Sequence, residues 1–297
     1  MPAVELPAGT IEYDDSGPPS GREDAPVVVL LHGLLMDATV WRAVAPGLAR
    51  EARVVAPTLP LGAHRIAMRP GADLSLRGMV RLVADFLDAL DLRDVTLVAN
   101  DWGGPILLVE EGLDARVGQL VLCACEAFDN FPPGLPGRLA RLAGRLGQAG
   151  VALAMPPLRN RRLRRFPLLF GWMSRRPVPE ELARGWFTPT RDRAIRRDLA
   201  TYAGSRFTRA EMTTATERLR DFDRPALVVW AREDRIMPPD HGRRLAQLLP
   251  QGRLVEVDDS RTLVPLDRPD VLLAELRAFV TERDPAAALR GSPRAGR

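Results

Sequence analysis

The chain has 297 residues, of which 46% are hydrophobic and 27% are charged, and its formal net charge is +4. This length suits one large hydrophobic core, or a core with an inserted subdomain. No run approaches the ~18 uninterrupted apolar residues of a membrane span, and the first residues lack the basic and apolar regions of a signal peptide. The expectation is a cytoplasmic protein with no membrane partner.

Arginine supplies all 42 basic residues, and lysine does not occur. This excludes a lysine Schiff base and an essential lysine–phosphate contact. The arginine-dense stretch 159–176 could attract phosphates or an anionic surface, or it could be the solvated face of an exposed helical segment. We favour the solvated face at this stage. Because no nucleic-acid module motif accompanies the stretch, we expect no nucleic-acid partner.

Strands and helices alternate along the first 124 residues. In chain order, the patterns predict a short strand or hairpin at 5–15, a buried strand at 27–31, a helix at 40–50, a strand at 53–56, a helix at 79–90, a strand at 95–98, a helix at 103–113 and a strand at 120–124. The helix at 79–90 carries a one-sided apolar stripe, and either Asp73 or Ser75 can cap it.

The alternation stops between about residues 128 and 224, where prolines and arginines dominate and the recognisable pieces are helical, such as 191–203. It then resumes with a strand at 226–230, a helix at 240–249, a strand at 253–257 and a helix at 270–281. Such alternation predicts right-handed crossovers and a mostly parallel sheet. We therefore expect a core at 1–127 and 223–282, a helical cap insertion at 128–222, and a tail at 283–297 with the composition of a disordered segment.

The two cysteines, Cys123 and Cys125, stand two residues apart in a strand-like run, which would point both side chains to one face of a sheet. With no histidine nearby, the pair is weak as a metal site, and we expect a buried, reduced pair. The sequence contains no ligand cluster and no dinucleotide-binding loop, so we expect neither a metal nor an organic cofactor.

The segment 96–104, Thr-Leu-Val-Ala-Asn-Asp-Trp-Gly-Gly, has the form of a nucleophile elbow, in which a tight strand-to-helix turn exposes one side chain above a sheet. Small residues at Ala99 and Gly103 permit so sharp a turn. The apex is Asp101, and a carboxylate there suits attack on saturated carbon, which gives an alkyl ester on the enzyme. The alternative is an aspartate that only caps the following helix.

With this elbow the chain resembles the α/β-hydrolase fold family, and in particular the branch of haloalkane dehalogenases and epoxide hydrolases, which use an Asp nucleophile in a D-W-G elbow. The other motifs that carry the resemblance are His32-Gly33 followed by Trp41-Arg42, the segment 230–234 with Pro238, and the loop 258–269. The resemblance covers roughly residues 10–282. It implies a mostly parallel central sheet flanked by helices, with the insertion as a helical cap.

The resemblance implies roles for five residues. Asp101 would be the nucleophile, and the backbone N–H groups of Leu34 and Trp102 would form the oxyanion hole. The acid of the family lies in the loop after the first strand that follows the cap, which indicates Asp234 as the group that orients a histidine. Glu126 is the alternative acid, because some dehalogenases place the acid at the end of the strand before the cap.

The position of the family's histidine base falls at Thr262, and a threonine cannot act as a general base at neutral pH. The chain has three histidines. His32 belongs to the loop beneath the oxyanion hole, and His241 begins a helix after Asp234, where we expect it to face solvent. His64 follows an early strand at the functional edge of the sheet and is the candidate for a surrogate base.

The sequence also lacks other side chains that haloalkane dehalogenases and epoxide hydrolases use. A dehalogenase holds its halide between two side-chain donors; Trp102 offers one through its indole N–H, but Leu34 stands where the other belongs. An epoxide hydrolase uses two cap tyrosines, and this chain has Tyr13, which precedes the core, and Tyr202, on a predicted cap helix. Tyr202 would either pack that helix or contact substrate.

Three hypotheses follow. The first is a hydrolase-like enzyme in which Asp101 attacks a small-to-medium apolar substrate (an epoxide, an alkyl halide or an ester-like molecule) with a triad that lacks its usual histidine. The second is a non-hydrolytic α/β-hydrolase-fold enzyme that uses Asp101 as an acid or base. The third is a degenerate homologue that binds a ligand without turnover. In each of them the partner is a small molecule.

Overall fold

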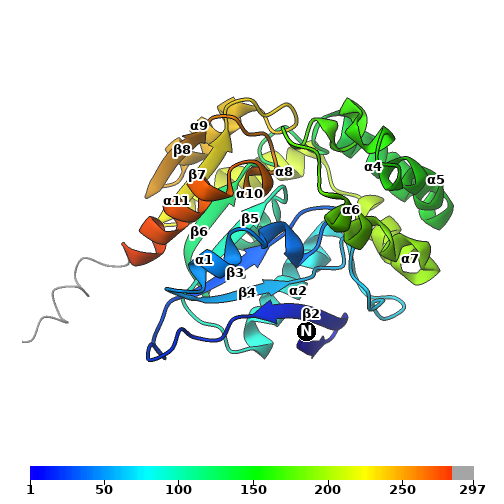
Figure 1. Cartoon of the computed structure of the whole chain (residues 1–297). Helices are drawn as coiled ribbons and strands as arrows, with labels where there is room; N and C mark the ends of the chain where they lie inside the picture. The colour runs from blue at the N-terminus through cyan, green and yellow to red at the C-terminus, as the bar shows by residue number, and fades with distance from the viewer. Residues whose placement is uncertain (283–297) are drawn as a thin grey trace, which may run out of the picture.

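The structure is a computed structural model, and it describes residues 1–282; the tail expected at 283–297 lies outside the described residues. An eight-stranded sheet runs through the centre, with the strand order β1-β2-β4-β3-β5-β6-β7-β8 (Figure 1). Its strands are β1 (Ala3–Leu6), β2 (Gly9–Asp15), β3 (Val27–Leu31), β4 (Arg53–Pro57), β5 (Val95–Asn100), β6 (Val117–Cys123), β7 (Ala226–Ala231) and β8 (Gly252–Val257). β1–β2 and β2–β4 pair antiparallel and the other pairs are parallel, which confirms the predicted mostly parallel sheet.

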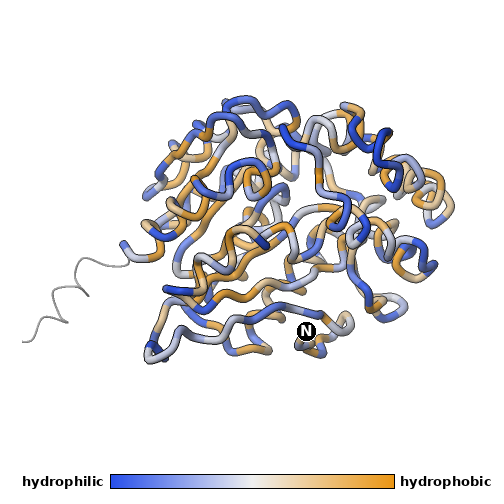
Figure 2. Tube along the Cα trace, in the orientation of Figure 1, coloured by the Kyte–Doolittle hydropathy of each residue, from blue (hydrophilic) through white to orange (hydrophobic). Residues whose placement is uncertain are grey.

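Helices cover both faces of the sheet, and each face has its own hydrophobic core because side chains alternate along every strand. Val29 and Leu31 of β3 pack with the helices on one face, whereas Val28 and Leu30 pack with those on the other. The first face carries α2 (Leu76–Ala89), α3 (Gly104–Glu110) and α9 (Pro239–Leu248), and the second carries η1 (Ala38–Trp41), α1 (Ala45–Leu48), α10 (Val264–Asp267) and α11 (Pro269–Thr281). Figure 2 shows the hydrophobic strands between these layers.

Two helix predictions are refined by the structure. Ser75 rather than Asp73 caps α2, since its side chain accepts the N–H of Gly78. The helix predicted at 40–50 is two shorter pieces, the turn η1 and the single α-helical turn α1. Pro46 explains the break, because a proline can occupy the first turn of a helix but not its interior.

The cysteines are free and buried, as expected, but they do not share a face. Cys123 packs in the core of one face of the sheet and Cys125 in the core of the other. The prediction was wrong because the strand ends at Cys123, and Ala124 then takes a positive φ of 38° that breaks the alternation.

A helical region is inserted between β6 and β7 and projects beyond one edge of the sheet (Figure 1). It contains α4 (Gly134–Arg145), α5 (Gly147–Arg159), η2 (Leu163–Arg165), η3 (Pro167–Gly171), α6 (Glu180–Phe187), η4 (Pro189–Arg191), α7 (Arg193–Ala203), α8 (Arg209–Glu217) and η5 (Arg218–Asp221). α4, α5 and α7 contact one another, whereas α8 packs against α3. No helix among residues 1–282 is long and apolar enough to cross a membrane.

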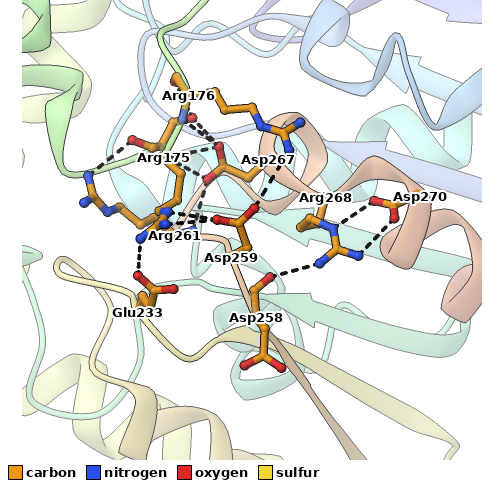
Figure 3. Close-up of polar contacts among 10 residues, drawn as sticks. Arg175, Arg176, Glu233, Asp258, Asp259, Arg261, Asp267, Arg268 and Asp270 are labelled. Atoms are coloured by element: carbon orange, nitrogen blue, oxygen red, sulfur yellow. Dashed lines mark hydrogen bonds and ion pairs between the residues drawn. The ribbon is translucent and has the colours of Figure 1, made fainter.

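One buried carboxylate anchors the inserted region to the core (Figure 3). Asp267, which is fully buried, accepts hydrogen bonds from the Ser174 hydroxyl at 2.7 Å and from the backbone N–H groups of Arg175, Arg176 and Arg261 at 2.9–3.1 Å. These bonds satisfy a charge that would be unfavourable if it were buried alone. Asp267 therefore holds residues 174–176 of the inserted region against the loop that contains Thr262.

Replacing Asp267 with alanine should destabilise the protein by about 3 kcal/mol, because several buried donors lose their charged acceptor together. The free energy of unfolding from urea titration measures the effect. Asp258→Ala is the matched control, since Asp258 lies in the same loop but is exposed; its loss should stay within about 0.5 kcal/mol. Equal losses in the two variants would contradict the anchoring role of Asp267.

Candidate active site

The sharp turn predicted at Asp101 is present. β5 ends directly before Asp101, whose φ of 68° lies in the left-handed region, and α3 begins three residues later. The N-cap of α3 is Gly103, and no side chain caps this helix. Asp101 is therefore the strained apex of a strand–turn–helix elbow and not a helix-capping aspartate.

Two glycines make room for the elbow. A Cβ atom on Gly33 would lie 2.2 Å from Oδ2 of Asp101, and a Cβ atom on Gly103 would lie 2.6 Å from the carbonyl oxygen of Glu126. Both distances are shorter than any normal contact, so neither position accepts a side chain unless the elbow moves. The His32-Gly33 motif thus packs directly against the carboxyl group of Asp101.

Thr262, at the position of the missing base, lies fully buried beside Asp234. Its hydroxyl donates a hydrogen bond to Oδ1 of Asp234 at 2.8 Å, and its carbonyl oxygen accepts one from Nδ2 of Asn100 at 2.7 Å. Oδ2 of Asp234 and Oδ1 of Asn100 are buried without a hydrogen-bond partner in the described chain. The structure thus brings Thr262, Asp234 and the elbow together, but it leaves two acceptors there without donors.

Sequence reasoning missed Asn100. The available signal was a polar residue placed directly before the apex in a strand that is buried along its whole length. Its side-chain amide also bonds the carbonyl oxygen of Cys123 at 3.0 Å, so it connects the elbow with both the neighbouring strand and the Thr262 loop.

Glu126 lies directly against the elbow. Its Oε2 accepts the N–H of Gly103 at 3.0 Å, and it lines the same cavity as Asp101. Burial raises the pKa of Glu126 to about 7, although the Gly103 N–H acts in the opposite direction. Near neutral pH this carboxyl group is therefore divided between its charged and its neutral form.

Asp101 has the most strongly shifted carboxyl group of the site. Burial raises the pKa of Asp101 well above its usual value, and the charges of Glu126 and then Asp234 raise it further, while the Leu34 N–H lowers it. Burial also raises the pKa of Asp234 to about 6, against the backbone N–H groups and the hydroxyl that bond it. Burial and the neighbouring carboxylates thus favour the protonated form of Asp101.

The carboxyl groups of Asp101 and Glu126 open onto an apolar cavity of about 450 Å³ between the sheet edge and the inserted helices. Its other polar lining residues are Arg141, Tyr202 and Ser205, and the remainder are aliphatic, aromatic, proline or glycine. Asp234 and Thr262 do not line it. A cavity of this size and composition suits an apolar small molecule whose reactive atom meets two carboxyl groups.

Leu34 and Tyr202, both predicted as site residues, line this cavity. Burial raises the pKa of the Tyr202 hydroxyl well above its usual value, and the nearby charges of Glu126 and Asp101 add to this, while the neighbouring Trp102 side chain acts in the opposite direction. Trp102 is buried at the elbow. Tyr202 therefore presents a neutral hydroxyl close to both carboxyl groups.

The three histidines do not line this cavity. His64 is buried and directed toward the inserted region: its Nε2 lies 3.3 Å from Oδ2 of Asp198 in α7. The expectation that His241 faces solvent was wrong, since it is 6% exposed and its ring packs edge-on against Phe128. In His32, Nδ1 bonds the Gly33 carbonyl and Nε2 accepts the Leu59 N–H, and burial lowers its pKa to about 4, so it is a neutral structural group.

No group of three or more histidine, cysteine, aspartate or glutamate side chains within residues 1–282 is arranged to hold a metal ion. The polar groups at the cavity include the carboxyl groups of Asp101 and Glu126, the Tyr202 phenol, the Ser205 hydroxyl and the Arg141 guanidinium. A carboxylate can attack carbon, and a neutral carboxyl group can donate a proton.

Comparisons with known proteins agree with this geometry. A family model described as alpha/beta hydrolase fold matches residues 26–269. An uncharacterised hydrolase of Bacillus subtilis is 25% identical over 85% of this chain and 89% of its own length. A cis-3-alkyl-4-alkyloxetan-2-one decarboxylase of Xanthomonas campestris is 27% identical over 94% of each chain. The solved structure of an ancestral haloalkane dehalogenase superposes with a TM-score of 0.72 at 22% identity, over 95% of this chain and 99% of that one.

The Glu126→Gln variant should become more stable than the wild type as the pH rises. The folded pKa of Glu126, about 7, lies above the ordinary glutamate value of 4.5, so the folded state holds this proton more tightly and loses stability as the pH rises toward and through 7. Glutamine keeps an acceptor for the Gly103 N–H but never ionises. We expect its advantage in free energy of unfolding to grow by about 2–3 kcal/mol between about pH 5 and pH 8.

Urea titrations at the two pH values test this, with Glu217→Gln, a change at an exposed glutamate, as the control. An advantage that is independent of pH would contradict the buried, proton-binding Glu126.

Proposed function

The chain belongs to the α/β hydrolase fold family, and on that premise we propose that it is an enzyme in which Asp101 attacks a carbon electrophile of an apolar small molecule. The observation that supports this is the elbow itself, which directs the Asp101 carboxyl group into a cavity of about 450 Å³ with apolar walls. Attack would form an alkyl ester between Asp101 and the substrate.

Glu126 serves as the proton acceptor and donor of this reaction. Burial raises the pKa of Asp101 and favours its neutral form, which must lose its proton before it can attack. Glu126, whose pKa of about 7 is suited to exchange at neutral pH, takes that proton. It returns the proton to the oxygen that leaves the attacked carbon, so charge is conserved and Glu126 is ionised again.

A strained ring is the electrophile that best suits the site. A halide leaving group requires two side-chain donors, and Leu34 supplies none. In an epoxide or a small lactone the leaving oxygen stays attached and takes a proton, which Glu126 or the neutral Tyr202 hydroxyl can supply. The Xanthomonas relative is named for an oxetan-2-one, a four-membered ring with alkyl chains. We therefore propose alkyl-substituted three- or four-membered rings as substrates.

Release of the product needs a water molecule. Glu126, ionised again after protonating the leaving oxygen, accepts a proton from water as the water attacks the ester carbonyl of Asp101. Glu126 returns this proton to the departing oxygen as the ester divides into the alcohol and the restored carboxyl group of Asp101, so that one water is consumed per turnover. Thr262 takes no proton in this scheme; it holds Asp234 through its hydroxyl.

A non-hydrolytic reaction is the second candidate, and it is favoured by the absence of a histidine from the lining of this cavity within residues 1–282. This reaction forms no covalent ester: the neutral Asp101 donates a proton to the ring oxygen while the ring fragments or rearranges. The same variants distinguish the two candidates, because the second never shows an enzyme ester.

Intact-mass spectrometry after incubation with long-chain alkyl epoxides and β-lactones tests the proposed function. The Asp101→Asn variant should form neither adduct nor product. The Glu126→Gln variant should form the adduct and release it each about 10²–10⁴-fold more slowly, because it lacks the acceptor for the Asp101 proton and the base for the second step. Product from the wild type with no adduct in any variant would favour the non-hydrolytic reaction, and a ligand bound equally by all variants without product would favour a binding protein.

A histidine restored at the position of the missing base should speed product release. In the Thr262→His variant, an imidazole N–H can donate to Asp234, whose Oδ2 now lacks a donor, while the other ring nitrogen accepts a proton from water. We expect turnover to rise at least about tenfold and to depend less on Glu126. The measurement is the rate of the second step in single-turnover experiments, with Thr262→Asn as the matched control. A histidine variant no faster than this control would contradict the assignment.

A further inference from the structure

The outer surface of the inserted region is unusually apolar. Of the ten exposed large hydrophobic side chains among residues 1–282, eight belong to this region: Leu135, Leu139, Leu142, Leu146, Leu153, Leu163, Phe166 and Leu168. The first four recur at helical spacing, so they form a stripe along α4 and the turn after it. Leu153 of α5 is 79% exposed. We call these eight side chains the apolar rim.

The same region is strongly basic. Residues 130–179 contain ten arginines and neither aspartate nor glutamate. The structure assigns no side-chain hydrogen bond or ion pair, within residues 1–282, to five exposed arginines of this segment: Arg138, Arg145, Arg161, Arg162 and Arg165. Figure 2 shows hydrophobic and hydrophilic residues interspersed along α4 and α5 at the outer edge of the molecule. Unpaired cations thus accompany the apolar rim.

The apolar rim is continuous with the cavity. Five of its members, Leu139, Leu142, Leu146, Leu153 and Leu168, also line the cavity that contains Asp101. These five leucines are therefore both exposed to solvent and part of the cavity wall. A molecule that contacts the apolar rim is already at the entrance to the site.

We propose that the apolar rim and its arginines dock this protein onto the surface of an anionic lipid bilayer. Leucine and phenylalanine side chains enter the boundary between head groups and acyl chains, while the arginines bind lipid phosphates and carboxylates. This combination of an apolar face with cationic neighbours is what binds proteins to membrane surfaces without a spanning helix. It gives the arginine-dense stretch 159–176 a role beyond that of a solvated face.

The charge of the region argues against the other occupants of such a surface. In a symmetric dimer the same face of each copy would meet, which would bring unpaired arginines together with no carboxylate to neutralise them. A nucleic acid could bind the arginines through its phosphates, but a phosphate backbone offers no apolar surface to the eight exposed aliphatic and aromatic side chains. A bilayer surface satisfies both the cations and the apolar side chains.

Docking would also supply the site with substrate from the lipid phase, and this consequence alone rests on the proposed function. An alkyl chain dissolved in the bilayer could pass between the rim leucines and reach Asp101 without crossing water. Docking does not depend on the reaction, so vesicle binding by a catalytically inactive variant tests docking without testing the proposed function.

Flotation with lipid vesicles tests the proposal on the full chain. The wild type should bind vesicles of phosphatidylcholine mixed equally with phosphatidylglycerol, and bind phosphatidylcholine alone at least roughly tenfold more weakly. The Arg161→Glu/Arg162→Glu variant should weaken binding by about fivefold or more for each arginine. The Leu163→Glu/Phe166→Glu variant, whose changes lie outside the cavity lining, should weaken binding roughly tenfold.

Two matched variants control for net charge and for general hydrophobicity. Arg22→Glu/Arg209→Glu changes two exposed arginines outside residues 130–179, and Ile66→Glu changes an exposed apolar residue outside the inserted region. Both should bind vesicles like the wild type, and circular dichroism establishes that every variant is folded. Asp101→Asn should bind fully, because docking does not need the reaction.

Four results would overturn the proposal. The first is no binding of the wild type to the anionic vesicles. The second is an equal loss in the control variants and in those of the region. The third is a dimer that the Leu163→Glu/Phe166→Glu variant dissociates while vesicle binding is unchanged, which would assign the apolar rim to a second copy. The fourth is binding of an RNA or DNA duplex in place of vesicles, which would assign the arginines to nucleic acid.

Discussion

The site depends on one constraint: the elbow directs the carboxyl group of Asp101 into a largely apolar cavity. The positive φ of Asp101 and the close approach of Gly33 leave its side chain no other direction. An ionised carboxylate is unfavourable in such a place, so the group holds a proton unless a neighbour accepts it. Glu126, bonded to the same elbow through Gly103, is the neighbour that the fold provides.

The site differs from a complete nucleophile–histidine–acid triad at Thr262, which stands where the histidine would be. A cationic imidazole at that position would stabilise the charge of Asp101 and satisfy Asp234 together. The threonine hydroxyl bonds Asp234 but contributes no positive charge, and one carboxylate oxygen of Asp234 keeps no donor. The Leu34 N–H lowers the pKa of Asp101, whereas the charges of Glu126 and Asp234 both raise it. The protonation of Asp101 therefore depends on that of the neighbouring carboxyl groups.

The features that could be predicted from the sequence are those that local residue patterns determine, namely the sheet and the turn at Asp101. Alternating apolar runs indicated the parallel sheet, and the small residues around Asp101 indicated the turn that the structure contains. It could not indicate which groups share the cavity, because this depends on side-chain directions after distant segments have met. Glu126 therefore was only an alternative acid, and Asn100 was missed. His241 was expected in solvent because helical position alone does not show that Phe128 covers its ring.

The proton on Asp101 is the centre of this account, and infrared difference spectroscopy observes it directly. A neutral carboxyl group has a carbonyl stretch distinct from that of a carboxylate, and the spectrum of the wild type minus that of Asp101→Asn isolates the contribution of this residue. At neutral pH the account predicts a protonated carboxyl band that Asp101→Asn removes and that Glu126→Gln shifts in its pH dependence. A carboxylate band at that pH, unchanged by Glu126→Gln, would contradict it.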